Sequence, residues 1–413
     1  MIEALNYRCL RYIKQDLGSF HVLVGPNASG KTTFFDVIRF LGDLVERDLD
    51  YAIRSRTENL QDLTWGRVGD RFELALEVGI PEEDRSLLVE AYDRCRYEVA
   101  VGVDSDTKEN AILAERVLLL KRPSKPKTLQ RTLFPEPSPD VPRTIMTSIP
   151  SKGIKTIVNK VPGGNDNYYS ERGKGWDPTF KLGPRKSALA NLPEDESKFP
   201  VSTRLKRMLV EGVQSLVLNS MFMRNPSSPG KRRGFQVDGS NLPWVVQELH
   251  DTSLRLKRDW VAHLQTALPE LDDILTFQRD EDRHRYLMVQ YAGGLIVPSW
   301  VVSDGTLRLL ALTLLAYVPK VNGIFLIEEP ENGIHPRAVE TVFQSLSSVY
   351  NAQILLATHS PVILGLAKPA DILCFAKSSS GATDVIRGID HPALRDWQGE
   401  TNLGTLYAAG VLG

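Results

Sequence analysis

A short glycine-rich pattern near the start of the chain constrains the fold more than any other feature of the sequence. The pattern G-x-x-x-x-G-K-[ST] is matched by Gly25, Pro26, Asn27, Ala28, Ser29, Gly30, Lys31 and Thr32. The apolar run at 20–24 predicts a buried strand, and the apolar spacing from 31 to about 54 predicts a helix. A strand, a tight glycine turn and a helix in this order point backbone N–H groups and the helix dipole at one anion.

This arrangement predicts a binding site for the phosphates of a nucleotide. Lys31 would reach the β- and γ-phosphates, and the Thr32 hydroxyl would bind Mg²⁺. Thr33 belongs to the same first helical turn and is included in the predicted nucleotide-binding set. The alternative is a glycine turn without a ligand, which the strand before it and the helix after it disfavour.

A second apolar run ends in two adjacent carboxylates. Residues 324–330 read Ile-Phe-Leu-Ile-Glu-Glu-Pro, which predicts a buried strand with Glu328 and Glu329 at its carboxyl end. Ligands of α/β sheets bind at that end of the strands. Glu328 would contact Mg²⁺ directly or through its water, and Glu329 would orient or deprotonate an attacking water. The alternative is a strand end with two solvated glutamates.

Other apolar patterns predict an α/β fold in which helices flank a mostly parallel sheet. Residues 323–327 and 353–357 read as buried strands, whereas 307–318 is apolar nearly all round and reads as a buried helix. Residues 336–350 have the spacing of an amphipathic helix, and 244–268 predicts one or two helices. Apolar strands that alternate with helices are typical of parallel sheets.

Several further segments carry a resemblance to a known family. Ser303-Asp304-Gly305-Thr306 precedes the buried helix, Glu331 to Pro336 follows the acidic strand, and Thr358-His359-Ser360-Pro361 follows the strand at 353–357. Together with the phosphate loop, these segments resemble the ATP-binding-cassette (ABC) ATPases of the SMC/RecF/OLD-like branch. The resemblance covers about 1–80 and 285–365 and implies a P-loop NTPase fold of the ABC ATPase type.

The resemblance implies a composite ATP site that is shared between two copies of the chain. Ser303, Asp304 and Gly305 would form the signature motif, which contacts the γ-phosphate bound by the other subunit, so that hydrolysis requires a homodimer. Lys31, Glu329 and His359 would be the catalytic set, with His359 bonded to the γ-phosphate or to the attacking water. Gln61 could be the glutamine that touches Mg²⁺, although an ordinary exposed loop glutamine is an equally good interpretation.

The chain departs from this branch in three respects. Glu328 stands where the metal-side residue is usually aspartate, and its extra methylene changes the reach to the metal. No heptad pattern or Cys-x-x-Cys hook predicts a long coiled-coil arm, and too few residues follow His359 for a Toprim nuclease domain. The end of the chain, from Trp397 to Leu412, reads as a docking tail that packs either on its own domain or on a partner.

The organisation predicted from these patterns is an ATPase divided by an insertion. Residues 1–80 would form the lobe with the phosphate loop, 81–285 an arm-like insertion, and 286–413 the lobe with the signature, acidic strand, histidine and tail. Between 121 and 200, proline, glycine, serine and basic residues replace sustained periodicity, which predicts irregular structure.

Charge is distributed unevenly along a chain that is nearly neutral as a whole. The net charge is −1, but residues 121–233 contain 22 lysines and arginines against 9 acidic residues. This basic insertion could bind DNA or RNA through its cations, with Tyr168, Tyr169, Trp176 and Phe180 stacking on bases. A solvated segment that balances the acidic remainder, and a docking site for an acidic protein, are the alternatives.

These observations favour an ATPase that dimerises around ATP and couples closure to nucleic-acid sensing. It would control a separately encoded effector, for example a nuclease, in DNA repair or antiphage defence. A scaffold that binds ATP with little hydrolysis and a subunit of a transport ATPase are the alternatives. Three distant cysteines, no apolar run of bilayer length and no leader-like N-terminus predict a cytoplasmic protein without a membrane segment.

Overall fold

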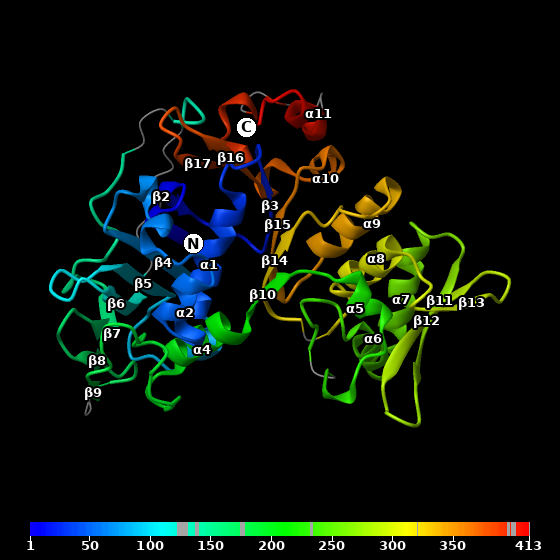
Figure 1. The fold of residues 1–413 in the computed structure, drawn as a ribbon, viewed down its shortest axis with the longest axis horizontal. Coiled ribbons are helices and arrows are strands. Elements are labelled where there is room, and N and C mark those ends of the chain that lie inside the picture. The colour runs from blue at the N-terminus through cyan, green and yellow to red at the C-terminus, as the bar shows by residue number, and fades with distance from the viewer. Residues whose placement is uncertain are drawn as a thin grey trace.

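The computed structural model describes residues 1–121, 131–136, 140–173, 178–231, 234–319, 321–394, 397 and 402–412. A six-stranded sheet lies at the centre, an eight-stranded antiparallel sheet lies on one side and a lobe of helices with a small sheet lies on the other (Figure 1). Within the described ranges, no helix has both the length and the apolar character that crossing a bilayer requires.

The central sheet is parallel except at one edge. Its order is β10 (Val213–Leu216), β14 (Gly323–Glu328), β15 (Ala352–Ala357), β3 (Phe20–Val24), β16 (Ile372–Lys377) and β17 (Thr383–Arg387). Only the β16–β17 pair is antiparallel. Glu328 pairs with Ala357, and Ala357 pairs with Leu23, so β14, β15 and β3 end at the same level. This register brings the acidic strand end, the histidine segment and the phosphate loop to one edge.

Both faces of the central sheet are buried, which explains its continuous apolar runs. Leu23, Leu326 and Leu355 face the core that contains α1 (Lys31–Glu46) and the antiparallel sheet. Val22 and Phe325 face the opposite core, which contains the helical lobe. The predicted strands at 323–327 and 353–357 and the mostly parallel sheet are therefore confirmed.

The antiparallel sheet contains much of the segment for which we expected irregular structure. Its order is β2 (Leu10–Gln15), β1 (Ile2–Tyr7), β4 (Arg71–Gly79), β5 (Arg94–Val103), β6 (Asn110–Leu120), β7 (Ile154–Lys160), β8 (Asp166–Tyr168) and β9 (Thr179–Phe180). The expectation for 121–200 was wrong for β7 to β9, because β8 and β9 are too short to show periodicity and the β6–β7 register shifts at Val117/Leu118. The boundary predicted after residue 80 lies between β4 and β5, which are paired strands.

Helices are present in the four regions where they were predicted, 31–54, 244–268, 307–318 and 336–350, with two breaks that capping residues explain. The remaining helices are α2 (Leu49–Arg54), α3 (Glu82–Arg85), α4 (Pro200–Glu211), α5 (Ser220–Arg224), α6 (Leu242–Thr252), α7 (Leu254–Gln265), α8 (Asp304–Leu314), α9 (Pro336–Ser347), α10 (Pro361–Leu366) and α11 (Leu403–Ala408). The single helix predicted for 31–54 is divided because Asp48 caps α2 by accepting a hydrogen bond from the Tyr51 N–H. Ser253 divides 244–268 in the same way, by capping α7.

The helical lobe joins the central sheet through α8 and α9. A three-stranded antiparallel sheet of β11 (Leu271–Gln278), β12 (Arg285–Tyr291) and β13 (Ile296–Pro298) covers its outer side (Figure 1). The buried residues of α8 pack in the same core as those of α6, α7 and α9. The N-terminus of α8 is consequently held by a rigid packed layer.

Candidate functional site

The phosphate loop needs glycine at two positions. Gly25 has a φ of 147°, and a Cβ there would lie 2.1 Å from the Phe375 carbonyl oxygen. Gly30 has a φ of 106°, and its Cβ would lie 2.3 Å from the Thr383 hydroxyl oxygen. That hydroxyl donates a hydrogen bond to the Ser29 carbonyl at 2.8 Å, which supports the loop from behind. The loop is therefore fixed by its neighbours β16 and β17 as well as by its own sequence.

A cavity of about 420 Å³ lies in front of this loop. Its lining residues are Cys9, Asn27, Ala28, Ser29, Gly30, Lys31, Thr32, Thr33, Glu328, Glu329, Ala357, His359 and Lys377. The fold thus brings together the predicted residues from Asn27 to Thr33, both strand-end glutamates and the predicted histidine, whereas Gly25 and Pro26 do not line the cavity. Cys9 and Lys377 were not predicted as site residues. Cys9 follows β1 and Lys377 ends β16, and neither lies in a recognisable motif.

Lys31 is held by the loop itself. Its Nζ donates hydrogen bonds to the carbonyl oxygens of Gly25 at 2.7 Å and Pro26 at 3.0 Å. Burial lowers the pKa of Lys31 to about 8, although the carboxylates of Glu329 and Glu328 act in the opposite direction. A cation in this position at neutral pH is suited to a phosphate anion.

The residues at the predicted metal position fit Mg²⁺. The Thr32 hydroxyl donates to a Glu328 carboxylate oxygen at 2.8 Å, so two hard oxygen ligands lie side by side. Among the described residues, no group of three or more His, Cys, Asp or Glu side chains could hold a metal. Mg²⁺ usually takes one or two protein oxygens and completes its shell with phosphate oxygens and water, and Thr32 and Glu328 offer such a pair.

Glu328 is also held by an arginine that sequence reasoning missed. Arg39 Nη2 lies 3.0 Å from the second carboxylate oxygen of Glu328, and Arg39 Nε donates to the Ser215 hydroxyl at 2.7 Å. Arg39 lies seven residues after Thr32 on α1, so the two side chains share one helix face. This spacing could have predicted that Arg39 lies near the metal position. The ion pair with Arg39 holds the Glu328 carboxylate in place, at a position where aspartate is usual.

Glu329 has an uncommon backbone conformation for a residue other than glycine. Its φ is 48°, and its N–H donates to the Ala357 carbonyl at 2.8 Å. Such residues cluster at functional sites, where the surrounding structure holds them. A Glu329 carboxylate oxygen accepts a hydrogen bond from the Asn332 side chain. Glu329 lines the cavity.

His359 is held on both sides. Its backbone N–H and the Thr358 hydroxyl both donate to one carboxylate oxygen of Glu331, at 3.2 and 2.5 Å. Its Nδ1 lies 3.0 Å from the hydroxyl of Tyr407, which also donates to the Gly25 carbonyl at 3.2 Å. Burial and the Lys31 cation lower the pKa of His359, against the opposite effect of Glu329 and Glu331. Glu331 and Tyr407 were not predicted as site residues.

The signature residues lie elsewhere on the same molecule. Ser303 caps α8, and its hydroxyl oxygen accepts from the Thr306 N–H at 3.2 Å. Asp304 pairs with Arg224 at 2.6 Å. A Cβ on Gly305 would lie 2.5 Å from the Gly333 carbonyl oxygen. Position 305 therefore needs glycine because the segment after the acidic strand passes close to it. None of the three predicted signature residues lines the phosphate cavity.

Gln61 is not among the residues that line the cavity either. It is exposed in a short 3₁₀ turn, Leu60–Leu63, where its carbonyl accepts from the Thr64 N–H at 3.1 Å. Its role in metal binding stays a prediction.

Two solved structures are similar to the chain. One is titled "Crystal structure of the SmcHead bound to the C-winged helix domain of ScpA". The two sequences are 13% identical, the similarity covers 93% of the present chain and 95% of the chain in that structure, and the TM-score is 0.52. Another, an Smc head domain with an extended coiled coil bound to the C-terminal domain of ScpA, is derived from Pyrococcus furiosus. It is also 13% identical over 93% of this chain and 94% of that chain, with a TM-score of 0.49.

The first of these likenesses shows the fold, an α/β P-loop NTPase that resembles an SMC head domain, and confirms the predicted fold class. No curated protein matches the chain. A protein family described as "AAA domain, putative AbiEii toxin, Type IV TA system" matches residues 20–141 and 158–365, which is well over half of the chain. The chain therefore belongs to this family of P-loop ATPases.

Proposed function

We propose that the protein hydrolyses ATP in a homodimer, in which each nucleotide lies between the phosphate loop of one protomer and the signature helix of the other. The observation that carries this proposal is the division of the site. Lys31, Thr32, Glu328, Glu329 and His359 converge on one cavity, whereas the Ser303 cap of α8 is exposed and outside it. A second copy would supply the missing helix N-terminus.

In the proposed reaction, each residue of the cavity has a separate task. Lys31 and the loop N–H groups hold the β- and γ-phosphates, while Thr32 and Glu328 hold Mg²⁺, which neutralises charge on the phosphates. Glu329 orients the attacking water and accepts its proton. The Ser303 hydroxyl and the first N–H groups of α8 in the partner stabilise charge on the γ-phosphate.

Phosphate release and light scattering with Mg²⁺ and ATP test this function together. The wild-type protein should release phosphate, and Glu329→Gln should release little and accumulate as an ATP-bound dimer. Glu340→Gln is the matched control, because Glu340 is exposed on α9 and bonded to Gln344. A monomer with ATP in all three proteins would contradict the proposal. Wild-type dimers that release no phosphate would favour the scaffold alternative.

Nucleic acid as the trigger is the less supported half of the proposal. Many cations of the basic insertion are paired within the molecule: Arg185 with Asp50 and Glu109, Arg204 with Asp84, Arg207 with Glu196, and Lys160 with Asp166. Tyr168 cannot stack on a base, because it is fully buried and its hydroxyl donates to the Ala188 carbonyl at 2.9 Å. Trp176, Arg232 and Arg233 lie outside the described residues. These contacts support charge balance, one of the alternatives.

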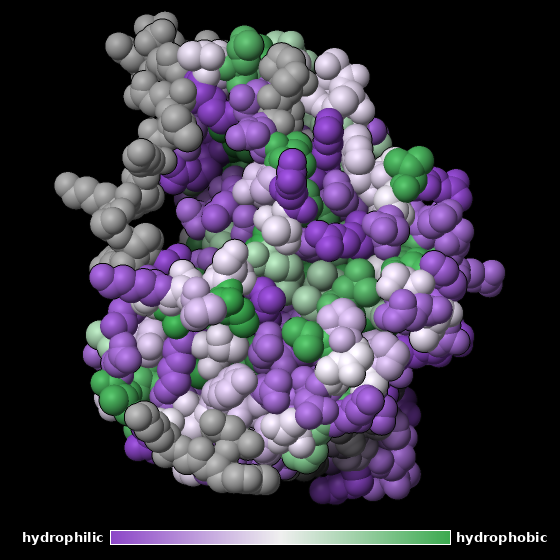
Figure 2. Space-filling model, turned by 90° about the vertical axis from the view of Figure 1, so that its left-hand side faces the viewer, coloured by the Kyte–Doolittle hydropathy of each residue, from purple (hydrophilic) through white to green (hydrophobic). Residues whose placement is uncertain are grey.

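The exposed cations that have no ion pair among the described residues keep nucleic acid in the proposal. Examples within the basic insertion are Arg143, Lys152, Lys181 and Lys186. On the side of the molecule that carries β6 to β9, hydrophilic side chains are mixed with white and green ones and form no continuous stripe (Figure 2). If nucleic acid binds here, Lys181→Glu with Lys186→Glu should abolish a salt-dependent stimulation of the ATPase by DNA or RNA. Unchanged stimulation would exclude this surface.

A separately encoded effector and a role in defence are the remaining parts of the proposal. The family description, which refers to type IV toxin–antitoxin systems, supports a defence setting. Co-purification with the product of a neighbouring gene tests for an effector, whereas co-purification with a polytopic membrane protein would support the transport alternative. A cytoplasmic location stays a prediction.

A further inference from the structure

The C-terminal helix reaches into the nucleotide site through one side chain. Tyr407, on α11, places its hydroxyl 3.2 Å from the Gly25 carbonyl oxygen and 3.0 Å from His359 Nδ1. It therefore joins the start of the phosphate loop to the histidine segment. These two parts of the site are more than 300 residues apart in the sequence, and the tyrosine comes from a third segment.

The two hydrogen bonds, taken together, favour one position for the histidine proton. The Gly25 carbonyl can only accept, so the single phenolic proton of Tyr407 is used in that bond. The oxygen of Tyr407 can then only accept from His359, which requires a proton on Nδ1. A neutral imidazole with a proton on Nδ1 has an unprotonated Nε2, which is an acceptor.

Protonation states favour this arrangement at neutral pH. Burial, with the Glu331 carboxylate, raises the pKa of Tyr407 above its usual value despite the Gly25 hydrogen bond, so the phenol keeps its proton. Burial and the Lys31 cation lower the pKa of His359, so the imidazole is neutral. The groups that face His359 from other elements are Lys31, Glu329, Glu331 and Tyr407.

Close packing fixes Tyr407 in this place. A Cβ on Gly404 would lie 2.1 Å from the Pro361 carbonyl oxygen, and a Cβ on Gly365 would lie 2.7 Å from the Asn402 side chain. The start of α11 therefore lies directly against α10, the helix that begins two residues after His359. Leu403 is buried in the core of the helical lobe. Of the two interpretations of the tail, these contacts favour packing on its own domain.

We propose that Tyr407 is a positioning residue that holds His359 in the Nδ1–H tautomer and leaves Nε2 as a hydrogen-bond acceptor in the cavity. This inference rests on the proposed ATPase function. An acceptor cannot bond to an unprotonated phosphate oxygen, because neither atom carries a proton. Neutral His359 therefore accepts a hydrogen bond from the attacking water, next to Glu329, and does not contact the γ-phosphate.

Nitrogen-15 NMR of histidine-labelled protein tests the tautomer without any enzymatic readout. We expect the His359 resonances, identified by their loss in His359→Asn, to show a protonated Nδ1 and an unprotonated Nε2. Tyr407→Phe should shift His359 toward a mixture of tautomers. Tyr350→Phe is the control, because Tyr350 is 94% exposed, and it should change nothing. An Nε2–H tautomer in the wild type, or no change in Tyr407→Phe, would overturn the proposal.

Steady-state kinetics with the same variants test the consequence for hydrolysis. Tyr407→Phe should lower kcat about tenfold, since one orienting hydrogen bond is lost. ATP affinity should change much less, because Lys31 still binds the Gly25 carbonyl. An unchanged kcat in an active enzyme would refute the positioning role. If the wild type shows no ATPase activity, the proposed function fails, and the NMR result still decides the tautomer.

Discussion

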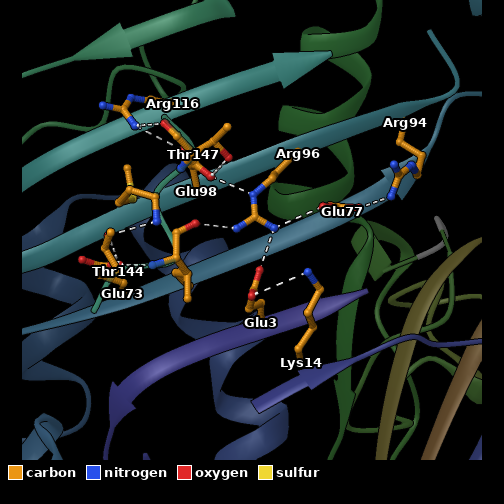
Figure 3. Close-up of polar contacts among 12 residues, drawn as sticks. Glu3, Lys14, Glu73, Glu77, Arg94, Arg96, Glu98, Arg116, Thr144 and Thr147 are labelled. Atoms are coloured by element: carbon orange, nitrogen blue, oxygen red, sulfur yellow. Dashed lines mark hydrogen bonds and ion pairs between the residues drawn. The ribbon is translucent and has the colours of Figure 1, made fainter. Parts of the chain in front are cut away.

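A buried arginine in the antiparallel sheet provides a quantitative test of the fold. Arg96 lies on β5, and its guanidinium contacts Glu98 at 2.7 Å, Glu3 at 2.8 Å, Glu77 at 3.1 Å and the Ile145 carbonyl at 2.9 Å (Figure 3). Burial lowers the pKa of Arg96, but the Glu3 and Glu98 carboxylates outweigh this effect and raise it. We predict that Arg96→Met destabilises the sheet and the segment 141–149, which crosses it.

The network explains how this crossing segment is held. Glu73 accepts from the Ile145 N–H at 2.7 Å, and Glu98 accepts from the Thr147 N–H at 2.8 Å. Arg96 donates to the Ile145 carbonyl, which lies between these two N–H groups in the sequence (Figure 3). Buried carboxylates and one cation therefore take the place of the strand pairing that the segment lacks. Loss of Arg96 would leave Glu3, Glu77 and Glu98 without their common partner.

The expected magnitude follows from the burial of the partners. Breaking a buried ion pair from one side costs about 3–5 kcal/mol. Each carboxylate keeps one weaker or more exposed basic neighbour, namely Lys14 for Glu3, Arg94 for Glu77 and Arg116 for Glu98. We therefore expect a cost at the lower end of this range, about 3 kcal/mol. For backbone amides that exchange through local opening, this corresponds to roughly a hundredfold faster hydrogen exchange.

Hydrogen exchange of a peptide that covers 141–149 measures this effect. Its Ile145 and Thr147 amides should exchange roughly a hundredfold faster in Arg96→Met. Arg255→Met is the control, because Arg255 is 91% exposed and pairs with the exposed Asp259 at 3.8 Å. That change should cost no more than about 1 kcal/mol. Equal exchange in the two variants would refute the assignment of stability to the buried network.

Two further predictions concern the phosphate loop. Gly25→Ala should weaken ATP binding at least about a hundredfold in a folded protein, because its Cβ would lie 2.1 Å from the Phe375 carbonyl oxygen. Calorimetry compares this variant with Gly79→Ala, where a Cβ would enter open space. Equal ATP affinities of the two variants would contradict the loop geometry. ATP affinity should also fall as pH rises above about 8, because burial lowers the pKa of Lys31 to about 8 and deprotonation removes the cation that binds phosphate. The decline should approach tenfold per pH unit, and flat affinity to pH 9.5 would refute it.

Sequence patterns predict the parts of this protein that local physics determines. The phosphate loop, β14 and β15 were predicted because a strand buried on both faces is apolar along its whole length, and because the loop has a fixed residue pattern. The positions of Glu328 and Glu329 followed from the ends of strands in a parallel sheet, whereas the role of His359 was implied by the family resemblance. The apolar helix pattern that follows Ser303, together with the family resemblance, placed it at a helix start, where it caps α8.

The rest depended on contacts between distant segments, which leave no local pattern. Tyr407 meets His359 only because α11 packs on α10, and Lys377 reaches the cavity only because β16 lies next to β3. Tyr168 illustrates the reverse error. Its place in the basic insertion suggested an aromatic that stacks on bases, but β7 and β8 pair and bury it in the core of the antiparallel sheet.

Mixed dimers test the shared ATP site most directly. Lys31→Ala disables one half of each site and Ser303→Arg the other, so each variant alone should be inactive. Mixing them creates dimers with one intact site, and we predict recovery of about a quarter of wild-type phosphate release if subunits exchange at random. Lys31→Ala mixed with Glu329→Gln is the control, because both changes affect the same half-site, and should recover nothing. No recovery in the first mixture, or full activity of Ser303→Arg alone, would contradict the account.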